Sequence, residues 1–305
     1  MTKIFRPMLA CNAPQVLTAP ERFFASPKLD GVRCVLHPEL GAITRSGKRV
    51  ANKATAEVLE TLAPLALDGE LILGDPTDKD VFRKTSAFLR NENAPLSSDL
   101  RFYAFDSIAN PTLYAGTRIA QYHKKCYLHE KISLRPLPQI RLKSQAHLEE
   151  VIAAHIEAGF EGTMLRLASG QYKNGRSTER EAGLMKIKPV EHAEARIDAF
   201  EPLFRNENAA QANELGYAKR SSHAEGLVAE DTLGALVCSS SEARFPNQFN
   251  IGSGFTEEER KEIWRNRQSL KGAIVRFKYQ AIGSVLAPRC PIFLGMRPIE
   301  DAESA

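Results

Sequence analysis

The chain has 305 residues, enough for one large domain or two moderate ones, and its 43% hydrophobic and 26% charged residues are ordinary for a soluble globular protein. The formal net charge of +4 is too small to indicate a nucleic-acid partner by itself. Five scattered cysteines without a Cys-x-x-Cys pair exclude a zinc ribbon, and no apolar leader or membrane-length apolar segment is found, so we expect reduced thiols in a cytoplasmic protein.

The first part of the chain alternates between segments typical of short strands and segments typical of helices. Strands are indicated by β-branched and aromatic runs, helices by apolar residues at helical spacing, and breaks by Gly, Pro and Asp. In chain order we expect a hairpin at 32–50, a helix at 53–62, a strand pair bent at Asp-Gly at 65–73, a helix at 78–90, an aromatic-rich strand at 100–108 and a helix at 117–130.

The clearest amphipathic helix is predicted in SQAHLEEVIAAHIEAG, residues 144–159. Ser144 can cap its start and Gly159 can end it. His155 lies on its apolar face without a second histidine or carboxylate at ligand spacing, so we expect a packed histidine and not a metal ligand. Two short strands follow, EGTMLRL at 161–167 and GLMKIKP at 183–189. Together these elements predict an α+β unit dominated by antiparallel strands.

Beyond Pro189 the pattern changes to an all-β one. Strands are expected at 195–204, 233–238, 245–251 and 272–279, with one helix after a Thr256–Glu259 capping box. This set fits a small Greek-key barrel such as an OB-fold. The polar segment 205–226 is too long for a hairpin turn, and we expect a long loop that is either functional or disordered. We place the boundary at 189–194, which gives domains at 1–190 and 191–305.

Charged residues and glycines gather at the predicted turns and strand ends, where a scaffold presents groups to a cleft. A single Lys-x-Asp-Gly motif is more typical of a turn lysine that pairs weakly with its aspartate. Here it is one of six motifs in order: Lys28-x-Asp30-Gly31-x-Arg33, Arg45-Ser46-Gly47, Asp68-Gly69-Glu70, Phe102–Asp106, Glu161-Gly162 and Lys186-x-Lys188.

This ordered set resembles the covalent nucleotidyltransferases, which are polynucleotide ligases and mRNA capping enzymes, and most of all the short, phage-type ATP-dependent DNA ligases. The likeness continues through LGALVC, FNIGSGFT, GAIVRFKYQ and PRCPIFLGMR in the second half. The resemblance implies an antiparallel-sheet nucleotidyltransferase domain followed by an OB-fold barrel, with a flexing hinge between them. It also implies a monomer that uses ATP and Mg²⁺ (or Mn²⁺) to seal nicks in double-stranded DNA.

By this resemblance Lys28 is the nucleophile that attacks the α-phosphate of ATP and carries AMP as a phosphoramidate. A lysine attacks only as a neutral amine, so its pKa must be depressed by burial, cations or metal. Arg33, Lys186 and Lys188 are the expected cations. The two lysines stand two apart in a strand, so both face one way while the apolar Met185 and Ile187 face the other; the alternative is a solvated edge strand.

The remaining residues of the predicted site have roles that the resemblance implies. Glu161 is expected to hold the metal, and Glu70 either the metal or the ribose, whereas either alone is more often a surface carboxylate. Arg45 is expected to grip the ribose or the phosphate at the break. Phe105 either stacks on adenine or simply packs in the core. Ser26 occupies the place where ligases carry a polar or acidic group that reads the adenine amino group.

DNA contacts are expected from Arg45, from the basic loop with Lys219 and Arg220, and from Arg297, the plausible equivalent of an arginine in a C-terminal ligase motif. Glu300 and Asp301 are out of step with that motif. The helix at 256–267 interleaves basic and acidic residues, so we expect a solvated face. The alternatives are an RNA ligase, a capping guanylyltransferase and a non-catalytic nucleic-acid-binding relative.

Overall fold

The computed structural model describes residues 4–14, 16–126, 133–240, 242, 245–280 and 286–297. The chain divides into two compact units, one of Met1–Lys188 with Glu214–Gly216 and the other of Pro189–Asn213 with Tyr217–Ala305. No helix in the described ranges is long and apolar enough to cross a membrane. The α+β class predicted for the first unit and the all-β class predicted for the second are both confirmed.

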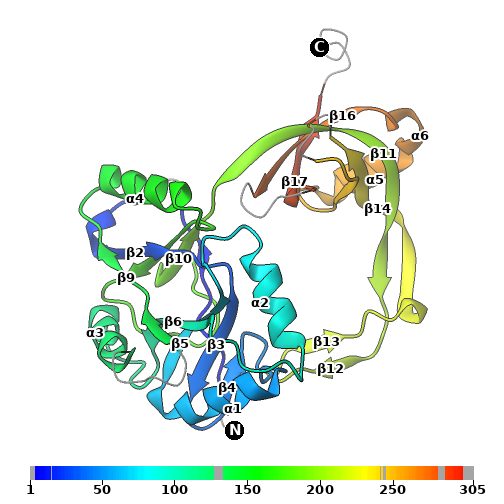
Figure 1. Cartoon of the computed structure of the whole chain (residues 1–305). Coiled ribbons are helices and arrows are strands. Elements are labelled where there is room, and N and C mark those ends of the chain that lie inside the picture. The colour runs from blue at the N-terminus through cyan, green and yellow to red at the C-terminus, as the bar shows by residue number, and fades with distance from the viewer. Residues whose placement is uncertain are drawn as a thin grey trace. The chain divides into compact units, whose positions relative to one another are not determined.

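Two five-stranded sheets form the first unit (Figure 1). One has the order β1 (Cys11–Asn12), β10 (Leu184–Ile187), β9 (Thr163–Leu167), β2 (Phe23–Pro27) and β8 (Ile140–Arg141). The other has the order β4 (Gly41–Thr44), β3 (Val32–His37), β5 (Leu67–Leu73), β6 (Leu100–Ser107) and β7 (Ser133–Pro136). Pairing is antiparallel except between β1 and β10 and between β6 and β7. The turn after β2 leads directly into β3 and so links the two sheets.

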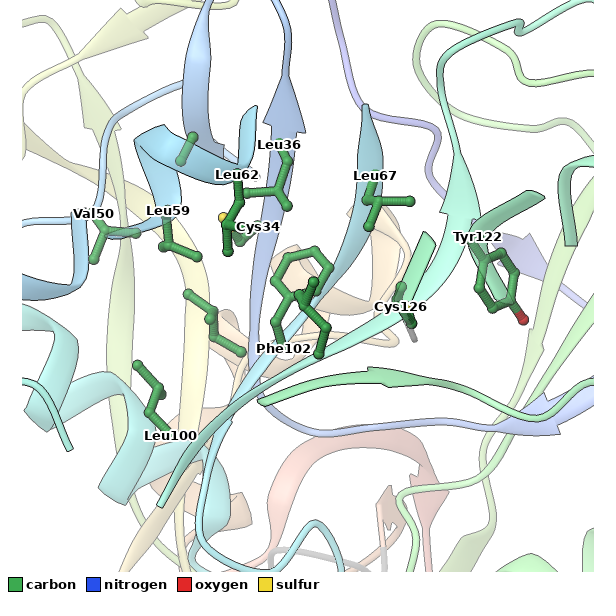
Figure 2. Packing of buried hydrophobic residues seen from close by; sticks show 14 of the residues in the cluster. Cys34, Leu36, Val50, Leu59, Leu62, Leu67, Leu100, Phe102, Tyr122 and Cys126 are labelled. Atoms are coloured by element: carbon green, nitrogen blue, oxygen red, sulfur yellow. The ribbon is translucent and has the colours of Figure 1, made fainter. Parts of the chain in front are cut away.

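Helices α1 (Lys53–Leu62), α2 (Val81–Arg90) and α3 (Ala115–Cys126) each contribute buried residues to the main core of the β3–β5–β6 sheet. Figure 2 shows Leu59, Leu62, Tyr122 and Cys126 of α1 and α3 packed against the sheet around Phe102. Each fully buried leucine here stabilises the fold by about 1.5–3 kcal/mol relative to exposure. This core holds the sheet that carries several of the predicted site residues.

Helix α4 (Gln145–Glu157) packs Leu148 and Val151 against the other sheet. Its predicted ends are confirmed. The Ser144 hydroxyl accepts a hydrogen bond from the His147 backbone N–H at 3.1 Å, and Gly159 takes a φ of +89° just after the helix.

The predicted strand pair at 65–73 is wrong, because β5 is one continuous strand. Gly69 is required for close packing and not for a turn: a Cβ at this position would lie 2.5 Å from the ring of Phe102 on the neighbouring strand. The predicted helix at 117–130 corresponds to α3, and its positions 127–130 lie outside the described residues.

The second unit is a curled five-stranded sheet with the order β15 (Phe249–Ile251), β14 (Leu227–Ser239), β11 (Val190–Asn206), β16 (Ile274–Gln280) and β17 (Arg289–Met296). Its two edges meet at an isolated bridge between Ser253 and Ile292, where the Phe293 N–H donates to the Ser253 carbonyl at 2.8 Å. The sheet therefore closes on itself as the predicted OB-fold barrel does. Helices α5 (Glu257–Arg265) and α6 (Arg267–Leu270) follow Thr256, whose capping box with Glu259 is confirmed.

Two expectations for this unit are corrected. The segment 205–226 is not a structureless loop: β11 and β14 run on as a paired ribbon to Asn206 and Leu227, and β12 (Ala210–Ala212) pairs with β13 (Ala218–Arg220) (Figure 1). Strand β17 was not among the four strands expected. It contains Pro291 and Gly295, which indicate breaks in a sequence but are tolerated in a strand at the edge of the sheet.

Candidate active site

Strands β2 and β10 end, and strand β9 begins, at the same end of the first sheet. Thr163, at the start of β9, pairs with Pro27 at the end of β2 and with Ile187 at the end of β10. Because β9 runs antiparallel to both neighbours, the residues just beyond this row lie together. These residues are Lys28, Glu161 and Lys188, so the structure brings together three side chains that the sequence analysis took from separate motifs.

Glu161 is the centre of this cluster. Its side chain is 2% exposed, and its two carboxylate oxygens contact the ammonium groups of Lys28 and Lys188, which are 20% and 21% exposed. Burial raises the pKa of Glu161, but attraction to Lys28 and hydrogen bonds from both lysines outweigh burial, so the net pKa lies below its ordinary value. The carboxylate is therefore ionised and holds both cations at the strand edge.

The backbone fixes the same arrangement. The Lys28 N–H donates to the Gly162 carbonyl at 2.8 Å, and the Glu161 N–H donates to the Lys28 carbonyl at 3.2 Å. Gly162 has a φ of +152°, and a Cβ there would lie 2.1 Å from the Ile187 carbonyl oxygen. Glycine is needed because two backbones approach here more closely than any side chain allows.

Lys186 lies on β10 with its predicted face pattern: Met185 is buried and Ile187 packs against the same hydrophobic cluster, so the lysines at 186 and 188 point away from that core. The pKa of the Lys186 ammonium is lowered, first by burial and then by four nearby cations, Lys188, Arg176, Lys28 and Arg45. Four cations within electrostatic reach of Lys186 favour a strongly anionic ligand such as a triphosphate.

The second sheet contributes a row of polar residues. Arg33 on β3 pairs in register with Glu70 on β5, which pairs with Tyr103 on β6. Burial raises the pKa of Glu70 to about 7; Arg33 and Lys28 oppose this shift, while Asp68 and Glu161 add to it. Glu70 is thus close enough to Lys28 and Glu161 to feel their charges, and it is a carboxyl that gains from a nearby cation.

Arg33 is held rigidly. Its Nε and Nη2 donate to the two oxygens of buried Asp68, each at 2.5 Å, and its guanidinium lies 4.7 Å from the centroid of the Phe105 ring. Burial lowers the pKa of Arg33, but the charge and hydrogen bonds of Asp68, together with the charges of Tyr172 and Glu70, outweigh burial, so the net pKa is raised. Phe105 also packs against the hydrophobic cluster of Leu29, Ile72, Val81 and Leu137, which fits core packing, and stacking on adenine stays a prediction.

Three other residues of this unit, Arg45, Ser26 and His155, are not part of the ion-paired cluster of Lys28, Glu161 and Lys188. Arg45 is exposed in the turn after β4, and Ser26 is 5% exposed in β2. His155 is a packed histidine, as expected: its Nδ1 hydrogen-bonds the Thr163 hydroxyl at 2.8 Å, and burial lowers its pKa.

In the second unit, Lys219 and Arg220 are exposed on β13, and the Arg220 guanidinium donates to the Asn208 carbonyl. Arg297 forms an ion pair with Glu194 on β11 at 2.8 Å. Glu300 and Asp301 lie outside the described residues. Helix α5 has its expected solvated character only in part, because Arg260 instead donates to the carbonyls of Leu233, Gly234 and Gly252.

Sequence reasoning missed Asp68, Tyr172 and Arg176. Asp68 belongs to the Asp-Gly-Glu motif, but the motif does not indicate that its carboxylate binds the Arg33 guanidinium. Tyr172 donates to Asp68 from 104 positions away, and no local pattern indicates such a pair. Arg176 lies in the basic loop between β9 and β10. The positive charge of this loop is a sequence signal that could have indicated Arg176 as a site residue.

The carboxylates of Glu161 and Glu70 suit a divalent cation that the protein and the phosphates of a substrate bind together. The described parts of the chain contain no group of three or more His, Cys, Asp or Glu placed to hold a metal ion. Mg²⁺, however, is usually held by one or two carboxylates together with substrate phosphates and waters. Glu161 and Glu70 offer such a pair, and because burial raises the pKa of Glu70, a bound cation would favour its ionised form.

Comparisons with known proteins agree across the chain. The family described as ATP dependent DNA ligase domain matches residues 7–188, and the DNA ligase OB-like domain matches residues 228–297. A DNA ligase of Haemophilus influenzae is 25% identical over 270 residues, which cover 88% of this chain and 84% of the relative. The solved DNA ligase-adenylate of Chlorella virus is 26% identical, covers 96% of this chain and 100% of its own, and has a TM-score of 0.52. A Lig E DNA ligase structure, at 23% identity, shares the fold with a TM-score of 0.70 and covers 96% and 99%.

Proposed function

The chain belongs to the family of ATP-dependent DNA ligases, and on that premise we propose that it seals 5′-phosphate/3′-hydroxyl nicks in duplex DNA with Lys28 as its nucleophile. The observation that supports this choice of residue is the cluster of Lys28, Glu161 and Lys188 at one sheet edge, with Lys186 beside it. Lys28 is the one lysine among residues 23–31, which form β2 and the turn after it.

In the first step the Lys28 nitrogen attacks the α-phosphorus of ATP. The Lys28 ammonium first gives up a proton to water, which frees the nitrogen lone pair for the attack. A nitrogen–phosphorus bond forms, the bond to the oxygen that bridges to the β-phosphate breaks, pyrophosphate leaves, and the nitrogen loses its second proton. Glu161 positions the Lys28 Nζ, and Arg33, Lys186 and Lys188 stabilise the negative charge that develops on the phosphoryl oxygens. The covalent intermediate then divides the sealing reaction into steps that one pocket can serve.

In the second step a 5′-phosphate oxygen at the nick attacks the phosphorus of lysyl-AMP and frees Lys28. In the third step the 3′-hydroxyl attacks the 5′-phosphorus, the phosphodiester bond forms and AMP leaves. Both steps are in-line phosphoryl transfers, for which a protein supplies position and charge more than covalent chemistry. Arg45, exposed in its turn, is the residue of this unit that we assign to the phosphate at the break.

Glu161, together with Glu70, would hold Mg²⁺ or Mn²⁺ against the phosphates, and Glu70 is alternatively a ligand of the ribose. A bound divalent cation neutralises charge on the triphosphate and on the leaving pyrophosphate. Each carboxylate oxygen of Glu161 has a second lone pair, so Glu161 could hold the metal ion while it keeps its contact with Lys28. Phe105 would stack on adenine through the face of its ring that the Arg33 guanidinium does not cover.

We assign nucleotide transfer to residues 1–190 and DNA binding to residues 191–305. Lys219 and Arg220, exposed on the β12–β13 hairpin, and Arg297 are the proposed contacts with the phosphate backbone. The proposed hinge is narrower than 189–194, because the residues from Val190 on are paired with β16, which leaves Lys188 and Pro189 between strands.

The test is covalent labelling followed by nick sealing. We expect α-labelled ATP with Mg²⁺, and not GTP, to mark the wild type, and the marked protein to seal nicked duplex DNA. The Lys28→Ala variant should not be marked, whereas Lys53→Ala, which removes an exposed lysine of the same unit, should behave as wild type. Labelling by GTP would point to a capping enzyme, sealing of RNA alone to an RNA ligase, and no labelling to a binding protein.

A further inference from the structure

A closed circuit of hydrogen bonds surrounds Arg33. The Met8 N–H donates to the Tyr172 hydroxyl at 3.1 Å, and that hydroxyl donates to Asp68 Oδ2 at 2.6 Å. Arg33 Nη2 donates to the same carboxylate oxygen at 2.5 Å and to the Met8 carbonyl at 3.1 Å, which returns the circuit to its start. Met8, Asp68 and Tyr172 are 2%, 0% and 8% exposed, so water cannot easily replace any of these bonds.

The direction of the Tyr172 proton follows from its partners. A backbone N–H can only donate, so the hydroxyl accepts from Met8 and must send its own proton to Asp68. Burial, and then the charge of Asp68, raise the pKa of Tyr172, which keeps this proton in place. Tyr172 therefore acts as a fixed donor that orients the Asp68 carboxylate.

The circuit determines which part of Arg33 faces a substrate. The guanidinium uses Nε and Nη2 for Asp68 and Met8, and Phe105 covers one of its faces. Within the described ranges no hydrogen bond involves Arg33 Nη1, and 14% of the side chain is exposed. Nη1, with two N–H groups, is thus the edge left to bind an anion.

We propose that Tyr172 is a positioning residue for the reaction: through Asp68 and the backbone of Met8 it holds Arg33 so that Nη1 points at the phosphoryl group being transferred. The inference rests on the proposed function, because it takes Arg33 to stabilise that phosphoryl group. A loosened Arg33 would still attract ATP by its charge but would align poorly in the transition state. The rate at saturating ATP should therefore fall while the KM for ATP changes little.

The experiment compares Tyr172→Phe with Tyr122→Phe. Tyr122 is a matched control, since it is also buried in this unit, donates to the Leu137 carbonyl at 2.6 Å and accepts from Gln139 at 3.1 Å, but does not touch Arg33 or Asp68. The measured quantity is the single-turnover rate of protein labelling by ATP as a function of ATP concentration. We expect Tyr172→Phe to label about tenfold more slowly at saturation, as for loss of an outer-shell partner, and Tyr122→Phe at the wild-type rate. Equal rates for the two variants would overturn the proposal.

A double-mutant cycle separates positioning from a general structural role. Lysine at position 33 keeps the charge but lacks the two-nitrogen edge that Asp68 grips, so Tyr172→Phe should slow the Arg33→Lys protein by less than about twofold. A further tenfold loss in that background would overturn the proposal. If Arg33→Lys and Arg33→Ala both label at the wild-type rate, the assigned role of Arg33 fails instead, whatever Tyr172 does. If the labelling rate of Arg33→Lys is too low to measure, the labelling rates of Tyr172→Phe and Tyr122→Phe alone decide whether the proposal stands.

Discussion

Replacing Gly162 with alanine should push apart the two backbones that bring the lysine–glutamate cluster together. The new Cβ would lie 2.1 Å from the Ile187 carbonyl oxygen, whereas Cβ atoms essentially never come within 3.0 Å of another heavy atom. The backbones must therefore separate by at least 0.9 Å, the difference between these two distances. Glu161 precedes the substitution directly and Lys188 follows the displaced carbonyl, so both ends of their ion pair move.

The size of the effect follows from that displacement. A misplacement of about 1 Å can lower a catalysed rate by roughly 100-fold, so labelling of Gly162→Ala by ATP should fall by about that factor. Stability should fall as well: the strained φ costs about 1–3 kcal/mol and the overpacking about 1–3 kcal/mol. Labelling rates and thermal unfolding curves measure the two effects on the same preparations.

Gly74→Ala is the matched control for this variant. Gly74 has a φ of +86°, but nothing lies within 4 Å of the position of its added Cβ. The control should therefore show backbone strain of about 1–2 kcal/mol without a change in the labelling rate. Wild-type labelling by folded Gly162→Ala would refute the argument that close backbone approach at this glycine sets the geometry of the cluster.

Three further predictions concern single side chains. Glu161→Gln keeps the shape but releases two ammonium groups, and we expect the ATP-labelling rate to fall at least about 100-fold; a loss below about threefold would contradict its role. Glu70 has a pKa of about 7 against an ordinary 4.5, so its contribution to stability is fully present below pH 4.5 and is lost as the pH rises through about 7. Urea unfolding of Glu70→Gln should lack this decline between pH 4.5 and 7, and an unchanged pH profile would contradict the shift. Lys219→Ala should leave ATP labelling intact and reduce the salt dependence of DNA binding by about one counterion, whereas an unchanged salt slope would remove Lys219 from the interface.

Local patterns in the sequence were sufficient for the elements that carry the lysines. The Lys186–Lys188 alternation predicts a strand with one apolar face, and Met185 and Ile187 occupy that face. Motifs at strand ends pointed to Lys28 and Glu161, and antiparallel pairing through Thr163 brings these ends together. This works because strand period and turn chemistry are short-range properties.

Long-range packing accounts for what the sequence did not reveal. Gly69 indicates a turn when only its neighbours in the sequence are considered. In the structure it lies within a strand, and the ring of Phe102 occupies the space that a side chain at this position would need. The ribbon and hairpin between Glu201 and Leu233 carry few buried residues, so no alternation of hydrophobic residues marks them. The pairing of Tyr172 with Asp68 depends on the folded arrangement of distant segments, which no window of sequence contains.

The position of AMP on the adenylated protein decides whether Lys28 is the nucleophile. The wild type would be incubated with ATP and Mg²⁺, digested, and its modified peptide sequenced by mass spectrometry; Lys28 and Lys188 share Glu161, so the position of the adduct separates nucleophile from neighbour. We expect AMP on Lys28 alone. AMP on Lys186 or Lys188, or no adduct on a protein that still seals nicks, would contradict it.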